Sequence, residues 1–367
     1  MLAYEGISTD GTHRLVLNLK DLNRFILNEH FKMEDSRVVC DILSKNDYLS
    51  KIDLKNAFHL VPVDDASRKY LRFIWKNKLY QYTCLPFGLC TAPRVFTKVI
   101  KPIIGYLREK GYKSVAYLDD FLLLGKTSAS CKQNFVFTKN LFEKLGFIVN
   151  LDKSCDTPAK IVQYLGLIFN TIDLNIYLPT KKAQNVRKLC KNSIKQPVMS
   201  IRVLSQLIGN LVASCPAVRY GSIYIKQLEY EKVKALNASN NNYDSTVLLS
   251  TMAVKDLEWW LQTDLLQGRP IRQDRYTVEL FSDASKSGWG GHMNLSVAKG
   301  SWSINEQSYH INVLELLAAF NCHRSFIIPQ YSSVLLRLDS ITAIAYINKQ
   351  GGCRSYRCGL VAKEIWQ

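Results

Sequence analysis

The sequence predicts an α+β protein built from two or three domains. Strand-like apolar runs alternate with segments of helical spacing over the first half, where residues 92–108 form the clearest helix. From residue 180 the chain changes to helices dense in lysine and arginine, and strands return after a Gly-Arg-Pro boundary at residues 268–270. The 367 residues, 47% of them hydrophobic, are enough to fill two or three cores.

The formal net charge of +17 indicates a polyanionic partner. Nucleic acid is favoured over an anionic membrane surface, because no apolar run is long enough to span a bilayer and the amino terminus lacks a secretion signal. The ten cysteines are scattered without the spacing of a zinc knuckle, which is typical of reduced thiols. We therefore expect an intracellular protein, in the cytoplasm or the nucleus.

Two adjacent aspartates interrupt the apolar stretch at residues 115–124, Val-Ala-Tyr-Leu-Asp-Asp-Phe-Leu-Leu-Leu. The two apolar runs predict a tight hairpin whose two-residue tip is Asp119 and Asp120. This pair is poor turn chemistry, since the favoured turns take Asn-Gly or Asp-Gly. Neighbouring carboxylates raise each other's pKa unless a cation lies between them, and hard oxygen ligands suit Mg²⁺. The alternative is a solvated acidic turn.

A third carboxylate, Asp53, ends a predicted strand within residues 48–58. A single aspartate at this place is commonly a helix N-cap. If Asp53 faces Asp119, however, it would complete a two-metal site of the kind used for in-line phosphoryl displacement.

Two regions are candidates for phosphate contacts. In the predicted strands at residues 69–78 and 81–83, basic and aromatic side chains alternate, which suits phosphates and stacked bases; a half-buried sheet with one solvated face explains the pattern equally well. The helices after residue 180 are favoured to track nucleic acid. Their basic residues include Lys181, Lys182, Arg187, Lys188, Lys191 and Lys195.

Periodicity and capping residues predict the other elements. We expect a loop at residues 1–12, a polar turn at 21–28 with Asn23 as a cap, and a long helix at 246–266. Further strands are expected at residues 14–19, 147–151 and 161–169, and helices at 41–49 and 135–145. The apolar residues of the long helix are predicted to pack in a core rather than to stack on bases. They are Leu248, Met252, Leu257, Trp260 and Leu261.

Carboxylates reappear beside strands in the last segment. Asp283 and Asp339 each follow a predicted strand, and the glycine-rich residues 288–291 are expected to form a turn. Glu315 lies in the run Val-Leu-Glu-Leu-Leu of a predicted helix, where an unpaired carboxylate is costly. A metal ion shared with Asp283 and Asp339 would relieve that cost. The alternatives are a salt bridge or a place on the wet face of the helix.

Five motifs resemble, in order, the successive motifs of retroelement reverse transcriptases. Five in order are very specific. Phe87, where retroviral enzymes usually have Gln, and residues 348–352 look most like the DIRS type, the tyrosine-recombinase retrotransposons. The motifs are Ile-Asp-Leu-Lys-Asn-Ala-Phe at 52–58, Leu-Pro-Phe-Gly-Leu at 85–89 with Ala-Pro-Arg-Val-Phe at 92–96, Tyr-Leu-Asp-Asp at 117–120, Leu-Gly-Phe at 145–147 with Lys153, and Tyr-Leu-Gly at 164–166.

The carboxy-terminal segment is similar to the RNase H domain that follows such polymerases, with Asp283, Glu315 and Asp339 at its first three acidic positions. The resemblance implies a right-hand polymerase of fingers, palm and thumb, followed by a partial RNase H-like α/β domain. Residues 1–178 would be fingers and palm, residues 179–270 a thumb or connection-like helical region, and residues 271–367 the RNase H-like domain, truncated at its C-terminus.

The resemblance also implies roles for single residues. Asp53, Asp119 and Asp120 would be catalytic and would bind Mg²⁺, with Mn²⁺ as an alternative, and the three carboxylates of the last segment would do the same. The partners would be an RNA template, a DNA primer, an RNA–DNA hybrid and deoxynucleoside triphosphates, while a dimer is left open. Phe58 would exclude the ribose 2′-hydroxyl. Nucleotide binding would also use Arg14, Phe87, Gly88 and Lys153, and a primer grip would use Tyr164, Leu165 and Gly166.

Three departures from the family pattern leave rival interpretations open. The lysine expected shortly before Arg14 is missing, with Ser8 and Thr9 near its place. The fourth RNase H carboxylate, and the last strand and helix of that fold, would lie beyond Gln367. We therefore expect weakened triphosphate binding, an impaired RNase H, and a fragment or decayed copy of an element. The rivals are an inactive nucleic-acid-binding remnant, a nuclease, and an RNA-templated RNA polymerase, which Phe58 disfavours.

Overall fold

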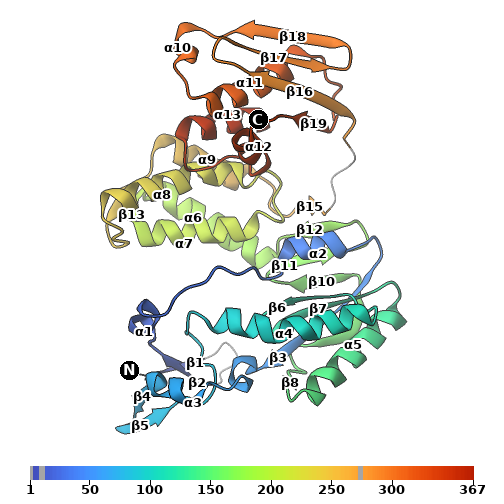
Figure 1. The fold of residues 1–367 in the computed structure, drawn as a ribbon, viewed down its shortest axis with the longest axis vertical. Coiled ribbons are helices and arrows are strands. Elements are labelled where there is room, and N and C mark those ends of the chain that lie inside the picture. Colours follow the sequence, from blue (N-terminus) through green and yellow to red (C-terminus); the bar gives the residue numbers. More distant parts are fainter. Residues whose placement is uncertain (1–2, 8–12, 272–275) are drawn as a thin grey trace. The chain divides into compact units, whose positions relative to one another are not determined.

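The computed structural model describes residues 3–7, 13–271 and 276–367. The chain divides into two compact units, Met1–Leu174 and Asn175–Gln367. Each unit contains both helices and strands, so the expected mixed α and β class is confirmed (Figure 1). Within the described part, no helix has the length and apolar character needed to cross a bilayer.

A five-stranded antiparallel sheet forms the centre of the first unit. Its strands are β3 (Tyr48–Lys55), β6 (Ser114–Tyr117), β7 (Asp120–Gly125), β8 (Ile148–Val149) and β9 (Cys155–Ala159), and it packs against helices α4 (Ala92–Glu109) and α5 (Ser128–Lys144). The order is β6-β7-β3-β8, with β9 also paired to β3. Ile52 and Phe121 of the sheet share one core with Phe96 of α4 and Phe142 of α5. This core holds the strands that carry the acidic residues.

Local sequence signals explain both helices. Pro93 lies in the first turn of α4, where its missing N–H has no helical partner to lose. Thr127 and Ser130 form a reciprocal capping box at the start of α5. Gly146, with φ +85°, follows the end of α5 in the left-handed conformation that glycine allows. The predicted helices at residues 92–108 and 135–145 are therefore confirmed, and α5 begins earlier than expected.

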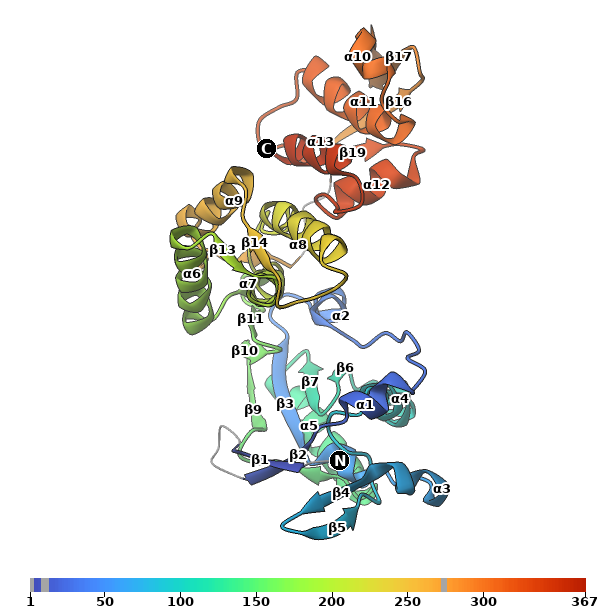
Figure 2. The ribbon, with the colours of Figure 1, turned by 90° about the vertical axis from the view of Figure 1, so that its left-hand side faces the viewer.

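Two hairpins lie at one end of the first unit (Figure 2). They pair β1 (Ala3–Ile7) with β2 (His13–Leu17) and β4 (Arg72–Trp75) with β5 (Lys78–Gln81). The small cluster of Leu17, Leu19 and Phe73 joins them. The expected loop at residues 1–12 is wrong for residues 3–7, because β1 pairs with β2; residues 1–2 and 8–12 lie outside the described part.

Two short elements before β3 differ from those that the sequence predicted. Residues 20–24 form helix α1 (Lys20–Arg24) rather than a turn, and Asn23 is not its cap. The side-chain amide of Asn23 instead donates to the Gly88 carbonyl at 2.9 Å and accepts from the Cys90 N–H at 2.9 Å. The helix expected at residues 41–49 lies earlier, as α2 (Ser36–Ile42), because Asp35 caps it and β3 begins at residue 48. The predicted strand at 161–169 is the hairpin of β10 (Ile161–Tyr164) and β11 (Leu167–Asn170).

The second unit begins with a helical region. Its elements are β12 (Asn175–Tyr177), α6 (Thr180–Lys195), β13 (Val198–Ser200), α7 (Ile201–Ser214), α8 (Lys226–Ala238), β14 (Thr246–Leu248), α9 (Thr251–Gln262) and β15 (Arg269–Pro270). The single long helix expected at residues 246–266 is wrong, because Ser250 caps α9 and the residues before it pair with β13. Leu248 is 66% exposed and does not pack in the core, whereas Leu257 and Trp260 are buried as expected.

A four-stranded sheet in the order β18-β17-β16-β19 forms the rest of the second unit. The strands are β16 (Val278–Ala284), β17 (Gly288–Met293), β18 (Ser296–Ser301) and β19 (Val334–Arg337), and the helices are α10 (Ile304–Gln307), α11 (Ile311–Ser325), α12 (Ile341–Asn348) and α13 (Tyr356–Trp366). The glycine-rich turn expected at residues 288–291 is wrong, because these residues form β17. A Cβ at Gly291 would lie 2.3 Å from the Phe281 carbonyl oxygen and 2.4 Å from Cys322 Sγ of α11, so close packing explains this glycine.

Candidate active sites

Asp53 and Asp120 are paired residues on neighbouring antiparallel strands, β3 and β7. Side chains of a strand alternate between the two faces of a sheet. Ile52 and Leu54 face the core shared with α4 and α5, so Asp53 faces the opposite way. Paired residues have Cβ atoms about 4.5–5.5 Å apart, which brings the two carboxylates together. Asp53, Asp119 and Asp120 are called the hairpin site below.

The hairpin was predicted correctly, but its tip is displaced by one residue. Tyr117 pairs with Asp120, so the two turn residues are Leu118 and Asp119. Leu118 has φ 54°, a conformation that is strained for a leucine, and its side chain packs against the main core of the unit. The N–H of Leu54 donates to the Asp119 carbonyl at 2.9 Å and ties the turn to β3. All three carboxylates therefore lie at one end of two bonded strands.

The carboxylates of the hairpin site repel one another. Desolvation, and then the charges of Asp119 and Asp53, raise the pKa of Asp120 to about 6. Lys51 acts in the opposite direction and lowers it. Such mutual repulsion is what a bound cation removes, so these residues fit a divalent metal ion.

The loop that carries Lys153 is bonded to the backbone of Asp53. The Asp53 N–H donates to Ser154 Oγ at 3.0 Å, and the Asn150 N–H donates to the Asp53 carbonyl at 2.8 Å. No local sequence pattern points to Ser154, because its partner lies 101 residues away in the chain. These two bonds hold the loop beside the strand that presents Asp53.

Phe58, just after β3, lies against Phe87 in the loop before α4. Phe58 is 9% exposed, and its ring centroid lies 5.0 Å from that of Phe87 and 5.1 Å from that of Phe96. Gly88 has φ +91°, which suits glycine, and its carbonyl accepts the bond from Asn23 described above. The backbone of Arg14 lies in β2 opposite Gly6, while its side chain is outside the described part, as are Ser8 and Thr9.

The three residues expected in a primer grip have different environments. Leu165 and Gly166, with φ 50° and 70°, form the turn between β10 and β11. Tyr164 is 3% exposed, and its hydroxyl donates to the Asp120 carbonyl at 3.1 Å. Tyr164 therefore lies within the fold against the acidic hairpin.

Glu34 and Arg108, which no sequence pattern singles out, cover the outer edge of β6. Glu34 accepts from the Ala116 N–H at 2.9 Å, and Arg108 donates to the Ser114 carbonyl at 2.8 Å. The two side chains also pair with each other at 2.6 Å. They satisfy the backbone groups of an edge strand that leads directly to the acidic turn.

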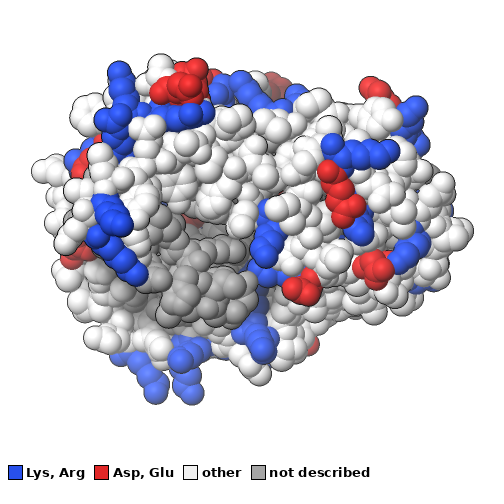
Figure 3. Space-filling model, turned by 90° about the horizontal axis from the view of Figure 1, so that it is seen from below, with Lys and Arg blue, Asp and Glu red and all other residues white. Residues whose placement is uncertain are grey.

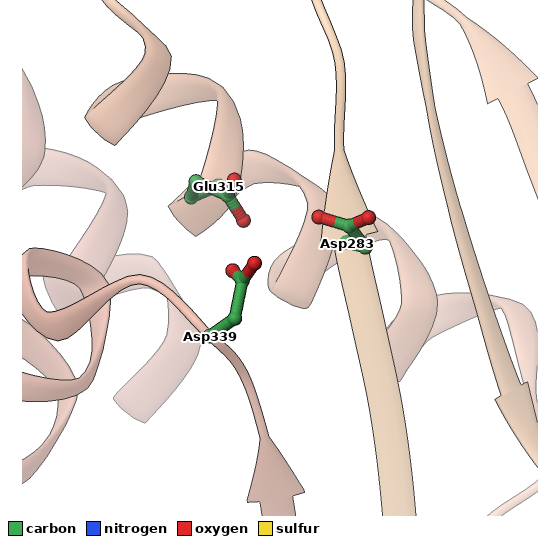
Figure 4. A group of neighbouring side chains, drawn as sticks. All are labelled: Asp283, Glu315 and Asp339. Atoms are coloured by element: carbon green, nitrogen blue, oxygen red, sulfur yellow. The ribbon is translucent and has the colours of Figure 1, made fainter.

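A second acidic group consists of Asp283 in β16, Glu315 in α11 and Asp339 after β19, called the carboxylate triad below (Figure 4). Their oxygen atoms lie within 4.8 Å of one another. Glu315 is 6% exposed, and its Oε2 is buried without a hydrogen-bond partner among the described residues. Desolvation, followed by the charges of Asp339 and Asp283, raises the pKa of Glu315 to about 7. A buried carboxylate oxygen that faces two further carboxylates fits a divalent cation.

This arrangement predicts an unusual dependence of stability on pH. The Glu315 carboxyl binds a proton more readily in the folded chain than in the unfolded chain, so without metal its contribution to the free energy of unfolding falls as pH rises from about 4.5 to about 7. At pH 8, Glu315→Gln should stabilise the metal-free protein by at most about 2 kcal/mol, after allowance for solvent screening. Thermal unfolding in a chelator measures this gain, which millimolar Mg²⁺ should abolish.

The control for that prediction is Glu258→Gln, at an exposed position of α9. It should leave the unfolding temperature unchanged at both pH 5 and pH 8. Equal stability of Glu315→Gln and the parent chain in chelator at pH 8 would contradict the prediction.

Basic side chains are widespread on the molecule, and on the face seen in Figure 3 lysine and arginine cover more of the described surface than aspartate and glutamate. In α6, Ala183, Val186 and Cys190 are buried on one side of the helix. Lys181, Arg187, Lys188, Lys191 and Lys195 are exposed. Lys182 differs, since it is half-buried, donates to the Ala213 carbonyl at 2.9 Å and has a pKa lowered by desolvation.

Comparison with known proteins gives a family match over part of the chain. Residues 8–169 match the family model described as reverse transcriptase (RNA-dependent DNA polymerase). This segment contains Asp53, Asp119 and Asp120 together with the strands that hold them.

Relatives of known sequence are polyproteins of viruses and transposons. The chain is 24% identical over 375 residues to the enzymatic polyprotein of carnation etched ring virus, covering 97% of this chain and 53% of the viral protein. It is 24% identical to the genome polyprotein of petunia vein clearing virus, covering 86% of this chain and 14% of that protein. The Tf2-3 transposon polyprotein of Schizosaccharomyces pombe is 27% identical over 43% of this chain and 12% of its own length. The chain thus spans about half or less of these relatives.

Solved structures match over nearly the whole chain. The foamy viral protease-reverse transcriptase in complex with double-stranded DNA covers 94% of this chain and 70% of its own, with a TM-score of 0.57 and 19% identity. The same protein in complex with an RNA/DNA hybrid covers 100% of this chain and 49% of its own, with a TM-score of 0.58 and 17% identity. The chain therefore has the fold of a viral reverse transcriptase, which confirms the expected right-hand polymerase fold. Residues 8–169 therefore resemble the reverse transcriptase domain of viral and transposon polyproteins.

Proposed function

We propose that the chain is the RNA-directed DNA polymerase of a retroelement and that the hairpin site is its catalytic centre. The observation that carries this proposal is the pairing of Asp53 with Asp120 next to the turn that presents Asp119. Two carboxylates on paired strands and a third in the adjoining turn supply the oxygen ligands that divalent cations take in phosphoryl transfer. Asp53 and Asp119 are the principal ligands in this proposal.

Bound Mg²⁺ at this site would acidify the primer 3′-hydroxyl and neutralise charge on the triphosphate and the leaving pyrophosphate. The protein residues orient the reactants. Lys153, held beside Asp53 by the loop bonds, would lie near the phosphates as a proton donor, and Arg14 would contact the triphosphate. Phe58 would exclude the 2′-hydroxyl, with Phe87 and Gly88 forming the neighbouring wall of the nucleotide site.

The nucleic acid would be an RNA template paired with a DNA primer. Foamy viral protease-reverse transcriptase, whose fold this chain shares, is known in complex with both double-stranded DNA and an RNA/DNA hybrid. The exposed basic residues of α6 would contact phosphates, which gives strong salt dependence and little sequence preference. Leu165 and Gly166, at the turn of their hairpin, would contact the primer. Whether two copies of the chain associate is left to measurement.

RNase H activity is a second candidate function, favoured by the carboxylate triad. The unpartnered Glu315 Oε2 among three converging acidic residues supports metal-assisted cleavage of the RNA strand in a hybrid. In this assignment residues 1–178 are fingers and palm, 179–270 a thumb or connection-like region, and 271–367 the RNase H-like domain. We propose the DIRS type for the element, because of the motif around Phe87 and residues 348–352. The element would be copied in the cytoplasm or the nucleus.

Primer extension tests the main proposal. The chain is incubated with an RNA template, a labelled DNA primer, deoxynucleotides and Mg²⁺, and extension is expected to fall steeply with added salt. A parallel reaction with RNA labelled within a hybrid measures RNase H. Tight binding of the template-primer without any extension would overturn the polymerase proposal and support the nucleic-acid-binding remnant.

A further inference from the structure

The hydroxyl of Tyr164 contacts both strands of the acidic hairpin. Tyr164 is in β10, and its hydroxyl donates to the Asp120 carbonyl at 3.1 Å. The same hydroxyl lies 3.5 Å from the Val115 carbonyl of β6. Tyr117 and Asp120 are the paired residues on either side of the Leu118-Asp119 turn. A single buried side chain thus bridges the two strands close to the turn.

This contact is separate from the packing of the tyrosine ring. The residue is 3% exposed, so the ring alone would satisfy a hydrophobic position. A tyrosine hydroxyl is protonated at neutral pH, so it can donate to these carbonyl groups. A phenylalanine would keep the packing and lose only the bridge.

The turn needs such support because its conformation is strained. Leu118 has φ 54°, and strained residues persist where the surrounding structure fixes them from several sides. Two hydrogen bonds fix the turn. The Leu54 N–H of β3 donates to the Asp119 carbonyl at 2.9 Å, and the Tyr164 hydroxyl of β10 donates to the Asp120 carbonyl. The two carboxylates follow these backbone positions, since each side chain has only two rotatable bonds.

We propose that the Tyr164 hydroxyl is a positioning group for Asp119 and Asp120, fixing the closing pair of the hairpin so that both carboxylates meet a divalent cation. This inference rests on the proposed polymerase function for its kinetic consequence. It assigns Tyr164 an action through the hairpin backbone rather than through contact with primer.

The test is Tyr164→Phe, measured first by Mn²⁺ binding. Electron paramagnetic resonance follows a Mn²⁺ titration of chains that also carry Asp283→Asn and Asp339→Asn, which removes the second acidic group. We expect Mn²⁺ affinity to fall about fivefold to tenfold, the worth of one buried hydrogen bond. In primer extension with otherwise unsubstituted chains, kcat should fall by a similar factor, while KM for the template-primer changes by less than about twofold.

Two further variants separate positioning from a general loss of structure. Tyr112→Phe is the matched control, since that ring stacks on Phe137 away from the turn and its variant should behave as the parent chain. Incorporation of 4-aminophenylalanine at position 164 restores a donor at the same place and should recover most of the Mn²⁺ affinity. Equal affinities of the phenylalanine and 4-aminophenylalanine chains would overturn the proposal, even if the first variant were less stable.

The kinetic result separates this inference from the proposed function. If the parent chain extends no primer, but Tyr164→Phe weakens Mn²⁺ binding, the polymerase proposal fails and the positioning role stands. If the parent chain is active and Tyr164→Phe raises only KM for template-primer, Tyr164 acts in a primer grip and the positioning role is wrong.

Discussion

Asp119→Asn is expected to abolish primer extension, with a loss of about a thousandfold or more in kcat. Asparagine has nearly the same shape, and the backbone bond from the Leu54 N–H to the Asp119 carbonyl does not involve the side chain. The fold should therefore be preserved. The lost charge weakens a metal ligand, and a neutral amide oxygen binds a hard cation less strongly than a carboxylate.

Binding and a matched control make that result specific. Template-primer affinity should stay within about twofold of the parent value, because phosphate contacts by basic side chains dominate it. Asp41→Asn, at an exposed aspartate of α2, should retain full activity. Extension by Asp119→Asn at more than about a tenth of the parent rate would rule out Asp119 as a principal metal ligand.

Local sequence patterns were sufficient to predict the elements that carry the hairpin site. Two apolar runs separated by two residues predicted the β6–β7 hairpin, and a strand ending at Asp53 was predicted where β3 lies. The spacing of apolar residues with Pro93 and Gly146 predicted α4 and the end of α5. The tip of the hairpin was predicted one residue too late in the chain, because two acidic residues suggest a turn. In the structure the Leu118 side chain packs against the core, so Leu118 is a turn residue and Asp120 is not.

The supporting contacts of the site could not be read from the sequence. Tyr164 and Asp120 are 44 residues apart, Ser154 and Asp53 are 101 apart, and Glu34 and Ala116 are 82 apart. No periodicity links residues at such separations, since each contact depends on how the strands assemble. The β17 error has the same origin: glycines in a strand and glycines in a turn look alike until α11 is seen to pack against Gly291.

Phe58→Ala is expected to raise the relative use of ribonucleotides by about a hundredfold, because the aromatic wall that would meet a 2′-hydroxyl is removed. Phe58 is held between Phe87 and Phe96, with ring centroids 5.0 Å and 5.1 Å away, so it cannot rotate freely out of the proposed nucleotide site. Phe87→Ala should relax sugar discrimination less, since it removes the brace and leaves the gate itself. Single-nucleotide insertion with matched ribo- and deoxynucleotides measures the ratio of kcat/KM values.

The substitution also opens a cavity in the core, and its cost must be separated from the loss of selectivity. Replacing a buried phenylalanine with alanine typically costs about 3–5 kcal/mol. Phe135→Ala is the control, because Phe135 of α5 is buried in the same core. This substitution should lower stability without changing the sugar preference. A Phe58→Leu chain should be more stable than Phe58→Ala and intermediate in selectivity. Unchanged discrimination against ribonucleotides in both Phe58 variants would show that the gate is formed by another residue.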